Sequence, residues 1–378
     1  MCKENIAQFT LRGRAGRRWR TRADRFVAVE LETLMRVLVT GHRGYLGSVL
    51  TCVLRNANFE VVGIDSDLYS GCDFGRVDET VPSYDFDVRD IEFADLLSFD
   101  AVVHLAALSD DAQGELDPEL TDEINLETTI RLAALCRRAQ VSRFLFASSC
   151  SVYGAGSCEL LHEDSPTNPL SRYAMSKLCA ERELANIACD GFTPVFLRNA
   201  TAYGVSPRLR TDIVVNDFVG AAVTSQRIVM RSAGQAWRPL IHVEDIARAY
   251  AAILTAPDEL VRNQAFNVAR CGENYRVIDV ADEVRGMVPF TTRQAATDTF
   301  DQRSYRVDAS KLRHAFPKLK MRWTLQLGIR QLHTAMENAG MTHGEWRSDR
   351  YRRIHRLRTM LEKGEVDKTL RRRELTLA

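Results

Sequence analysis

Short, continuous apolar runs alternate with amphipathic stretches over residues 35–200. The runs predict strands that are buried on both faces, and they read RVLVTG (36–41), EVVGID (60–65), AVVHLAA (101–107) and RFLFASS (143–149). Between them, apolar residues recur every three or four positions at 45–57 and 125–139, which predicts helices with one buried face. Strands alternating with helices indicate an α/β fold with a doubly wound parallel sheet of the Rossmann type.

The pattern becomes looser after Ala200. Residues 201–344 mix short strands and helices, among them a strand entering a helix at 240–254 and a further strand at 264–269. We therefore expect two domains, residues 35–200 and residues 201–344. The second should be a smaller mixed α/β domain that binds substrate, with some of its elements returning to the main sheet.

Both ends of the chain are basic. Residues 1–34 show little periodicity and are expected to form a disordered extension, with Met35 as a candidate start of the folded part. Residues 345–378 predict a helical extension whose Ile354, Leu357 and Leu361 lie on one stripe. We expect that helix to pack on the body or on a partner subunit rather than to bind RNA.

Composition narrows the class of protein. Hydrophobic residues make up 45% of the 378 residues, and no run of 18 apolar residues occurs, so no membrane span is expected. Nine cysteines without a CxxC pair favour reduced thiols in the cytoplasm over disulfides or a metal site. The two ends carry +4 and +5 of a net charge of +1, so the part between them carries −8. An acidic body argues against binding of nucleic acid.

Three glycines interrupt the chain where the first strand passes into the first helix. Gly41, Gly44 and Gly47 allow a tight turn and a close approach of a diphosphate to the backbone. The helix that follows offers unpaired N–H groups to the phosphates. Asp65 ends the second strand, where an acid binds the adenosine ribose hydroxyls and repels a 2′-phosphate. This combination predicts NAD as the cofactor in preference to NADP.

The spacing GxxGxxG resembles that of the extended short-chain dehydrogenase/reductase family, which contains nucleotide-sugar epimerases and dehydratases. Further motifs support the resemblance over about residues 35–340, namely FDVRD (86–90), HLAALS (104–109) and INLETT (124–129). The resemblance implies that the cofactor is also bound by Tyr45, Leu46, Asp87, Val88, Leu105, Ala106, Ala107 and Asn125. In the family the asparagine of the helix steadies the active site.

A YxxxK motif provides the candidate catalytic pair. Tyr173 and Lys177 are one helical turn apart, so both side chains lie on one face. The reference pKa of tyrosine is about 10, and lowering it to near 7 corresponds to roughly 4 kcal/mol, which we expect the Lys177 ammonium and the cofactor to supply. The resemblance implies that Ser149, three residues before the Val of VYG, bonds the reacting oxygen. Tyr173 and Lys177 would also contact the cofactor.

Residues around the serine restrict the reaction. In the 4,6-dehydratases of the family, Asp and Glu follow the catalytic Thr, whereas Cys150 and Ser151 follow Ser149 here. Neither is a good general acid, which disfavours dehydration. Cys150 is expected to be a packed core residue.

A further set of residues is expected to bind the substrate. Arg238 and Arg303 are candidates to hold a diphosphate, for which a planar guanidinium is well suited. Pro239 stands where the family usually has Asp after this arginine, and Thr201 stands where it often has Asn. The full set of candidate substrate residues is Ser109, Ser149, Asn199, Thr201, Asn216, Arg238 and Arg303.

The sequence therefore predicts an NAD-dependent epimerase that acts on a nucleotide-diphosphate sugar through a transient 4-keto intermediate. A dehydrogenase or ketoreductase with net redox at the same carbon is the alternative. A dehydratase and a non-catalytic NAD-binding protein are less favoured. By resemblance, the enzyme is expected to be a homodimer.

Overall fold

The computed structural model of the chain describes residues 34–76, 78–295 and 302–373. The described residues belong to one compact unit. The expectation of a disordered N-terminal extension therefore lies outside the described residues, apart from Leu34. Within the described ranges, no helix has the length and apolar character needed to cross a membrane.

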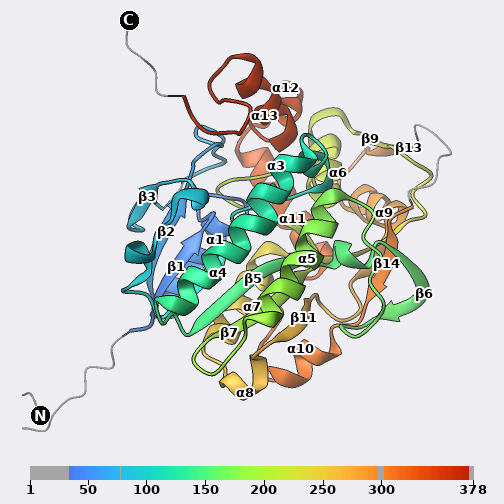
Figure 1. Cartoon of the computed structure of the whole chain (residues 1–378). Coiled ribbons are helices and arrows are strands. Elements are labelled where there is room, and N and C mark those ends of the chain that lie inside the picture. Colours follow the sequence, from blue (N-terminus) through green and yellow to red (C-terminus); the bar gives the residue numbers. More distant parts are fainter. Residues whose placement is uncertain (1–33, 77, 296–301, 374–378) are drawn as a thin grey trace, which may run out of the picture. The chain divides into compact units, whose positions relative to one another are not determined.

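A seven-stranded parallel sheet forms the centre of the molecule (Figure 1). Its order is β11-β7-β5-β4-β1-β2-β3. The strands are β1 (Arg36–Thr40), β2 (Glu60–Asp65), β3 (Ser83–Asp85), β4 (Ala101–His104), β5 (Arg143–Ser149), β7 (Thr193–Asn199) and β11 (Gln264–Val268). From β1 the chain continues to β2 and β3 on one side of the sheet, and then to β4, β5 and β7 on the other side. The strand order therefore reverses between β1 and β4, and a crevice opens at their carboxyl ends. The predicted Rossmann-type fold is confirmed, and β11 from the second half of the chain is an edge strand of this sheet.

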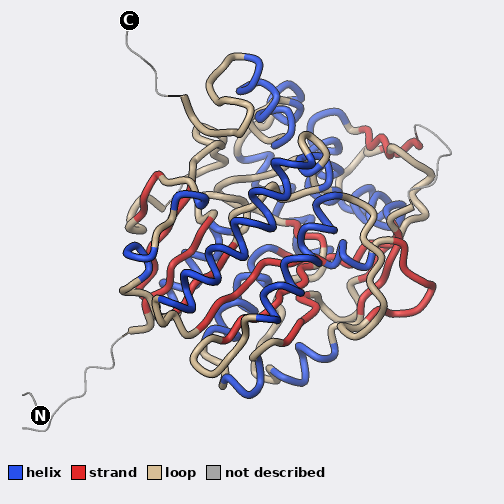
Figure 2. Tube along the Cα trace, in the orientation of Figure 1, coloured by secondary structure: helices blue, strands red, loops and turns tan. Residues whose placement is uncertain are grey.

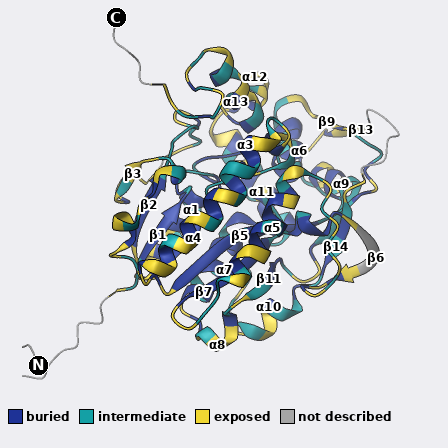
Figure 3. Ribbon diagram, viewed as in Figure 1, coloured by how far each residue is buried: buried dark blue, intermediate teal, exposed yellow. Residues whose placement is uncertain are grey.

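Helices cover both faces of the sheet, as the alternation of elements in Figure 2 shows. Because side chains of a strand alternate between faces, Val37 and Val39 join one core cluster and Leu38 joins another. The first cluster includes α1 (Gly47–Asn56) and α7 (Val243–Leu254), and the second includes α4 (Thr128–Arg138) and α5 (Arg172–Asn186). The buried strands and the exposed outer faces of the helices are visible in Figure 3.

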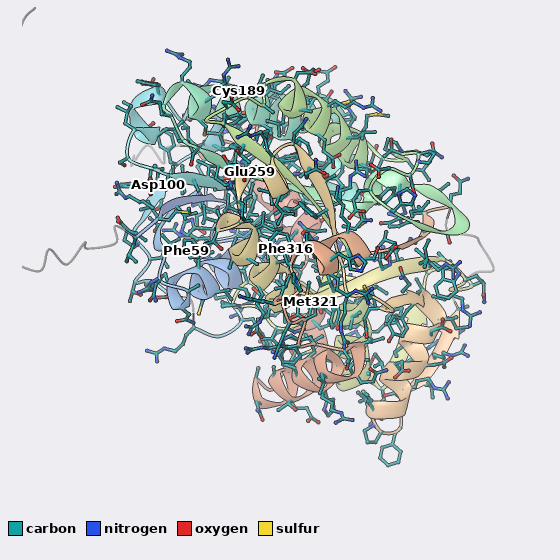
Figure 4. All side chains as sticks on the ribbon, turned by 90° about the horizontal axis from the view of Figure 1, so that it is seen from below. Phe59, Asp100, Cys189, Glu259, Phe316 and Met321 are labelled. Carbon is teal, nitrogen blue, oxygen red and sulfur yellow. The ribbon has the colours of Figure 1, made fainter. Side chains whose placement is uncertain are left out.

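Smaller elements complete the main body. Phe316 and Met321, which Figure 4 labels in the view from below, pack against the core cluster of α1 and α7. The short helices are α2 (Asp111–Gly114), α3 (Pro118–Asp122), α8 (Asp258–Val261) and α10 (Ser310–Ala315). A two-stranded parallel sheet pairs β6 (Ala155–Leu161) with β14 (Ser304–Val307).

The second half of the chain builds a smaller lobe around its own apolar cluster, which includes Tyr203, Phe218 and Trp346. Its strands are β8 (Thr201–Tyr203), β9 (Arg227–Met230), β10 (Trp237–His242), β12 (Asn274–Arg276) and β13 (Thr292–Ala295). Its helices are α6 (Val214–Ser225), α9 (Val277–Met287), α11 (Leu325–Asn338) and α12 (His343–Arg347).

The last helix, α13 (Arg353–Glu362), lies on the main body near α3, at the top of Figure 1. Leu357 and Met360 of this helix are buried in a small cluster together with Leu108 and Leu120. A leucine beyond the helix, Leu370, belongs to the same cluster. Helix α13 and Leu370 are thus packed against Leu108 of the loop after β4 and Leu120 of α3.

Candidate active site

A cavity of about 590 Å³ lies at the carboxyl ends of the central strands. Its lining runs from the glycine turn after β1, past the end of β5 and the start of α5, to residues of the smaller lobe such as Arg238. One continuous cavity therefore joins the predicted cofactor residues to most of the predicted substrate residues. Its place in the sheet is the one at which open α/β folds bind ligands.

The glycine turn is as tight as its sequence predicts. Gly41 has a φ of +73°, and a Cβ there would lie 2.8 Å from the backbone nitrogen of Ala106. A Cβ on Gly47 would lie 2.2 Å from the carbonyl oxygen of Gly41. No side chain caps the first turn of α1, and Gly47 at its start lines the cavity. Gly44, Tyr45 and Leu46 line the cavity beside it, an arrangement suited to a diphosphate.

Asp65 lies in the cavity wall at the end of β2. One of its carboxylate oxygens accepts a hydrogen bond from the backbone of Arg43 (2.9 Å) and the other from Asp67 (2.8 Å). Burial raises the pKa of this carboxyl group, against these hydrogen bonds. Each carboxylate oxygen can accept a second bond, so Asp65 has the capacity to bind ribose hydroxyls.

The next wall of the cavity comes from Asp87 and Val88. Burial opposes ionisation of Asp87, but hydrogen bonds from Arg89 outweigh it and hold its pKa below the usual value. The ion pair between Arg89 and Asp87 is 2.7 Å long. With the glycine turn and Asp65, these residues have the shape and the donor and acceptor groups that a dinucleotide requires.

The segment after β4 supplies Leu105, Ala106 and Ala107 to the cavity wall. Asn125, which the resemblance placed among the cofactor residues, does not line the cavity and is completely buried. Its side chain accepts a hydrogen bond from the Leu108 nitrogen (2.9 Å) and donates one to the Leu108 oxygen (3.0 Å). Asn125 therefore holds the loop in place and makes no direct contribution to the wall.

The three candidate catalytic residues come together in the middle of the cavity. Ser149 ends β5, and Tyr173 and Lys177 lie on the first two turns of α5. The Tyr173 phenol shares a hydrogen bond with the Ser149 side chain. The Lys177 ammonium lies 5.8 Å from the centre of the Tyr173 ring and 4.7 Å from that of Phe146. The spacing of the motif thus brings a phenol, a hydroxyl and an amine to one place.

Burial dominates the electrostatics of Tyr173 and Lys177 in the protein itself. Burial raises the pKa of Tyr173, and the hydrogen bond with Ser149 only partly opposes it. Burial also lowers the pKa of Lys177 from 10.5 to about 7. The expectation that Lys177 and NAD together lower the pKa of Tyr173 therefore stays a prediction for the enzyme with NAD bound. Desolvation disfavours both the phenolate of Tyr173 and the ammonium form of Lys177. Near neutral pH the lysine beside the phenol is therefore only partly protonated.

Five of the other predicted substrate residues line the cavity, namely Ser109, Asn199, Thr201, Arg238 and Arg303. Arg303 pairs with Asp111, at 2.5 Å. Asn216 does not line the cavity, because it is buried between two loops. It accepts from the backbone of Gly204 (3.0 Å) and donates to the carbonyl of Arg210 (2.8 Å), so its role in the fold is structural.

Cys150 faces away from the cavity. It is completely buried, and its thiol contacts the carbonyl oxygen of Arg198 at 3.1 Å. Burial raises the pKa of this thiol. Ser151 does line the cavity, but a hydroxyl is a weak acid. Neither of the two residues after Ser149 provides the acid and base of a 4,6-dehydratase.

Sequence reasoning missed several charged residues of the cavity wall. Arg210 is buried there between Asp110 and Asp212, and it donates to Ser109 at 3.1 Å. Ser109 and Asp110 lie about 100 residues from Arg210 in the sequence, and Asp212 lies in an irregular loop. No sequence motif therefore identifies Arg210 as a residue of the site. Arg231 of the smaller lobe and two residues of the C-terminal extension, Arg353 and Leu370, also line the cavity.

A dinucleotide-type fold with a serine, tyrosine and lysine at its crevice defines an enzyme of the extended short-chain dehydrogenase/reductase type. The model of the NAD dependent epimerase/dehydratase family matches residues 37–269. The chain belongs to this family, and it is an NAD-dependent enzyme.

Among similar proteins, the UDP-glucose 4-epimerase of Azospirillum brasilense is 33% identical over 181 residues, which are 47% of this chain and 51% of that protein. The match thus spans about half of that relative. The structure of the Thermus thermophilus UDP-glucose 4-epimerase in complex with NAD is 26% identical with a TM-score of 0.68, over 81% of this chain and 100% of that one. MoeE5 in complex with UDP-glucuronic acid and NAD is 27% identical with a TM-score of 0.69, over 80% and 99%.

Proposed function

We propose that the protein interconverts the C4 epimers of a UDP-hexose through a transient 4-keto sugar. One observation carries the proposal: Ser149 and Tyr173 lie in the same continuous cavity as the glycine turn at one end and Arg238 at the other. A sugar whose diphosphate is held by arginine would then reach the phenol while the cofactor lies beside it. The names of the relatives favour UDP as the nucleotide and glucose or glucuronic acid as the sugar.

In this mechanism the phenol of Tyr173 takes the proton of the C4 hydroxyl and later returns it, and Ser149 holds the reacting oxygen. NAD supplies, when bound, the hydride acceptor and a cationic ring that favours the phenolate. Lys177 contributes its charge in its protonated form. The keto sugar must turn over within the cavity so that the hydride returns to the opposite face.

Dehydration is less well supported than epimerisation. Cys150 faces the core. Asp110 and Asp111 in the cavity wall form ion pairs with Arg210 and Arg303, so neither carboxylate is free of a partner. The alternative of a net dehydrogenase or ketoreductase involves the same three residues and differs only in whether the hydride leaves with the cofactor.

The test is conversion of UDP-glucose and UDP-glucuronic acid without added cofactor, followed by chromatography of the products. We expect the 4-epimer to form without net NADH. Tyr173→Phe should lower turnover by a factor on the order of 10² to 10⁴ while NAD stays bound. Stoichiometric NADH would support the dehydrogenase instead. Near wild-type turnover of Tyr173→Phe would refute the role of the phenol.

A further inference from the structure

The C-terminal residues 351–373, called here the C-terminal segment, contribute two residues to the wall of the cavity. These are Arg353 and Leu370. The segment is anchored along its length: the Arg352 side chain donates to Asp217 (2.6 Å), and the Arg353 backbone nitrogen donates to Asp212 (2.9 Å). Together with the apolar contacts of α13, these bonds make the segment an integral part of the site.

Leu370 lies at the adenosine end of the cavity. The carbonyl oxygen of Thr369 accepts a hydrogen bond from the Arg89 side chain at 2.9 Å. On the other side of Leu370, Arg371 binds both carboxylate oxygens of Asp90, at 2.5 and 2.8 Å. Arg89 also holds Asp87 of the predicted adenosine site. The neighbours of Leu370 thus fix it over that site, and its side chain is only 2% exposed.

Arg353 is a buried cation with an unused donor. Its guanidinium lies 4.0 Å from the centre of the Tyr69 ring, and its Nη2 donates to the carbonyl of Arg208 at 3.1 Å. Its Nη1 is buried and has no hydrogen-bond partner among the residues that the structure describes. Burial lowers the pKa of this guanidinium. A buried donor on a charged group is costly when it is unpaired, so a ligand acceptor would stabilise it.

A chain of contacts places Arg353 near the glycine turn. The Ser206 hydroxyl donates to the carbonyl of Tyr45, a residue of that turn, at 2.8 Å. The Arg208 nitrogen donates to the same Ser206 hydroxyl at 3.1 Å, and Arg353 in turn binds the Arg208 carbonyl. These hydrogen bonds connect Arg353, through Arg208 and Ser206, to Tyr45 of the glycine turn.

We propose that the C-terminal segment is part of the cofactor site, in which Arg353 donates to a phosphate oxygen of the dinucleotide and Leu370 closes the adenosine end. The proposal rests on NAD occupying the half of the cavity next to the glycine turn. It accounts for the buried donor of Arg353 and for the close fit of Leu370 against the loops that carry Asp65 and Asp87. Its consequence is retention of NAD from one turnover to the next.

The proposal is tested by the release of NAD from the purified holoenzyme, because this measurement requires no turnover of a sugar. The protein is loaded with radiolabelled NAD and chased with excess unlabelled NAD. Arg353→Met should release the label about 10- to 100-fold faster, which corresponds to loss of one charge-assisted hydrogen bond. Arg353→Lys should release NAD at a rate between those of the wild type and Arg353→Met, because lysine keeps the positive charge but loses the planar guanidinium with its paired donors. Leu370→Ala should also release the label faster than the wild type.

Two matched variants serve as controls. Arg358 is exposed on the same helix and Leu361 is half-buried there, and neither lines the cavity. Arg358→Met and Leu361→Ala should release NAD at the wild-type rate. Wild-type release from Arg353→Met and Leu370→Ala would overturn the proposal.

A diphosphate is also present in the sugar nucleotide, so binding of UDP is measured in parallel. Wild-type release of NAD from Arg353→Met together with weaker binding of UDP would assign this cation to the substrate and overturn the proposal. Faster release of NAD from a protein that epimerises no sugar would support the C-terminal site and refute the proposed function.

Discussion

Replacing Lys177 by methionine should stabilise the nucleotide-free protein at neutral pH while it impairs turnover. The side chain is 3% exposed, and burial lowers the pKa of its ammonium group from 10.5 to about 7, with Glu181 opposing the change. In the unfolded chain the group keeps its proton up to about pH 10.5. The unfolded state therefore binds more protons between these two values, so the free energy of unfolding rises with pH across that window.

The linkage relation gives a magnitude for this effect. Relative to an uncharged side chain, burying Lys177 costs about 4 kcal/mol at pH 7 and about 2 kcal/mol at pH 9, because the proton that the folded protein releases costs less free energy to remove at the higher pH. Methionine does not titrate. The stability advantage of Lys177→Met over the wild type should therefore shrink by about 2 kcal/mol from pH 7 to pH 9.

The measurement is urea unfolding at pH 7, 8 and 9, followed by the fluorescence of the four tryptophans. Lys177→Arg is the control, because a guanidinium keeps its proton throughout this range. Lys177→Arg should be the least stable of the three proteins. Its free energy of unfolding should not rise with pH through titration of residue 177. Parallel pH profiles for the wild type and Lys177→Met, or a methionine variant that is less stable at pH 7, would refute the reasoning.

Two further substitutions test other parts of the site and its support. Asp65→Ala should narrow the ratio of the affinities for NAD and NADP in a binding titration, since the repulsion of a 2′-phosphate is lost; an unchanged preference would remove Asp65 from that role. Glu181→Gln should lower the free energy of unfolding by about 3 to 5 kcal/mol in urea, because it leaves the buried Arg198 without its counter-ion. Asp190→Asn, in an exposed ion pair, is the control, and an equal loss in both variants would contradict the prediction.

The elements of the central sheet could be predicted because each depends on local pattern. The run 143–149 predicted a strand, and β5 has the same bounds. The helix expected at 125–139 begins instead as a π-helical turn at Glu123–Glu127 before α4 continues to Arg138. Periodicity sets the buried face of a helix, but it does not distinguish the hydrogen-bond register of the first turn.

The candidate site could be predicted only as far as short motifs reach. Gly41, Asp65 and Tyr173 are marked by spacing, and the structure places all three in the wall of the cavity. Arg210 and Arg353 reach the same wall through contacts between segments far apart in the chain, so no local pattern identifies them.

A sequence motif also does not show how deeply its residues are buried. The YxxxK spacing correctly predicted that Tyr173 and Lys177 share a face, but the direction of both pKa changes follows from the desolvation that the whole fold imposes.

The position of the C-terminal segment also has a consequence for how the protein is loaded. During synthesis, the glycine turn, the central strands and α5 all leave the ribosome before Arg353 and Leu370, which complete the cavity wall. N-terminal parts of a chain generally fold first. A nascent chain that lacks the segment would thus present a crevice without these two residues, whereas in the proposed role of the segment a longer chain would have to move it before a dinucleotide enters. Addition of NAD to the finished apoprotein would then be limited by this opening, and its rate would become independent of the NAD concentration at high concentrations.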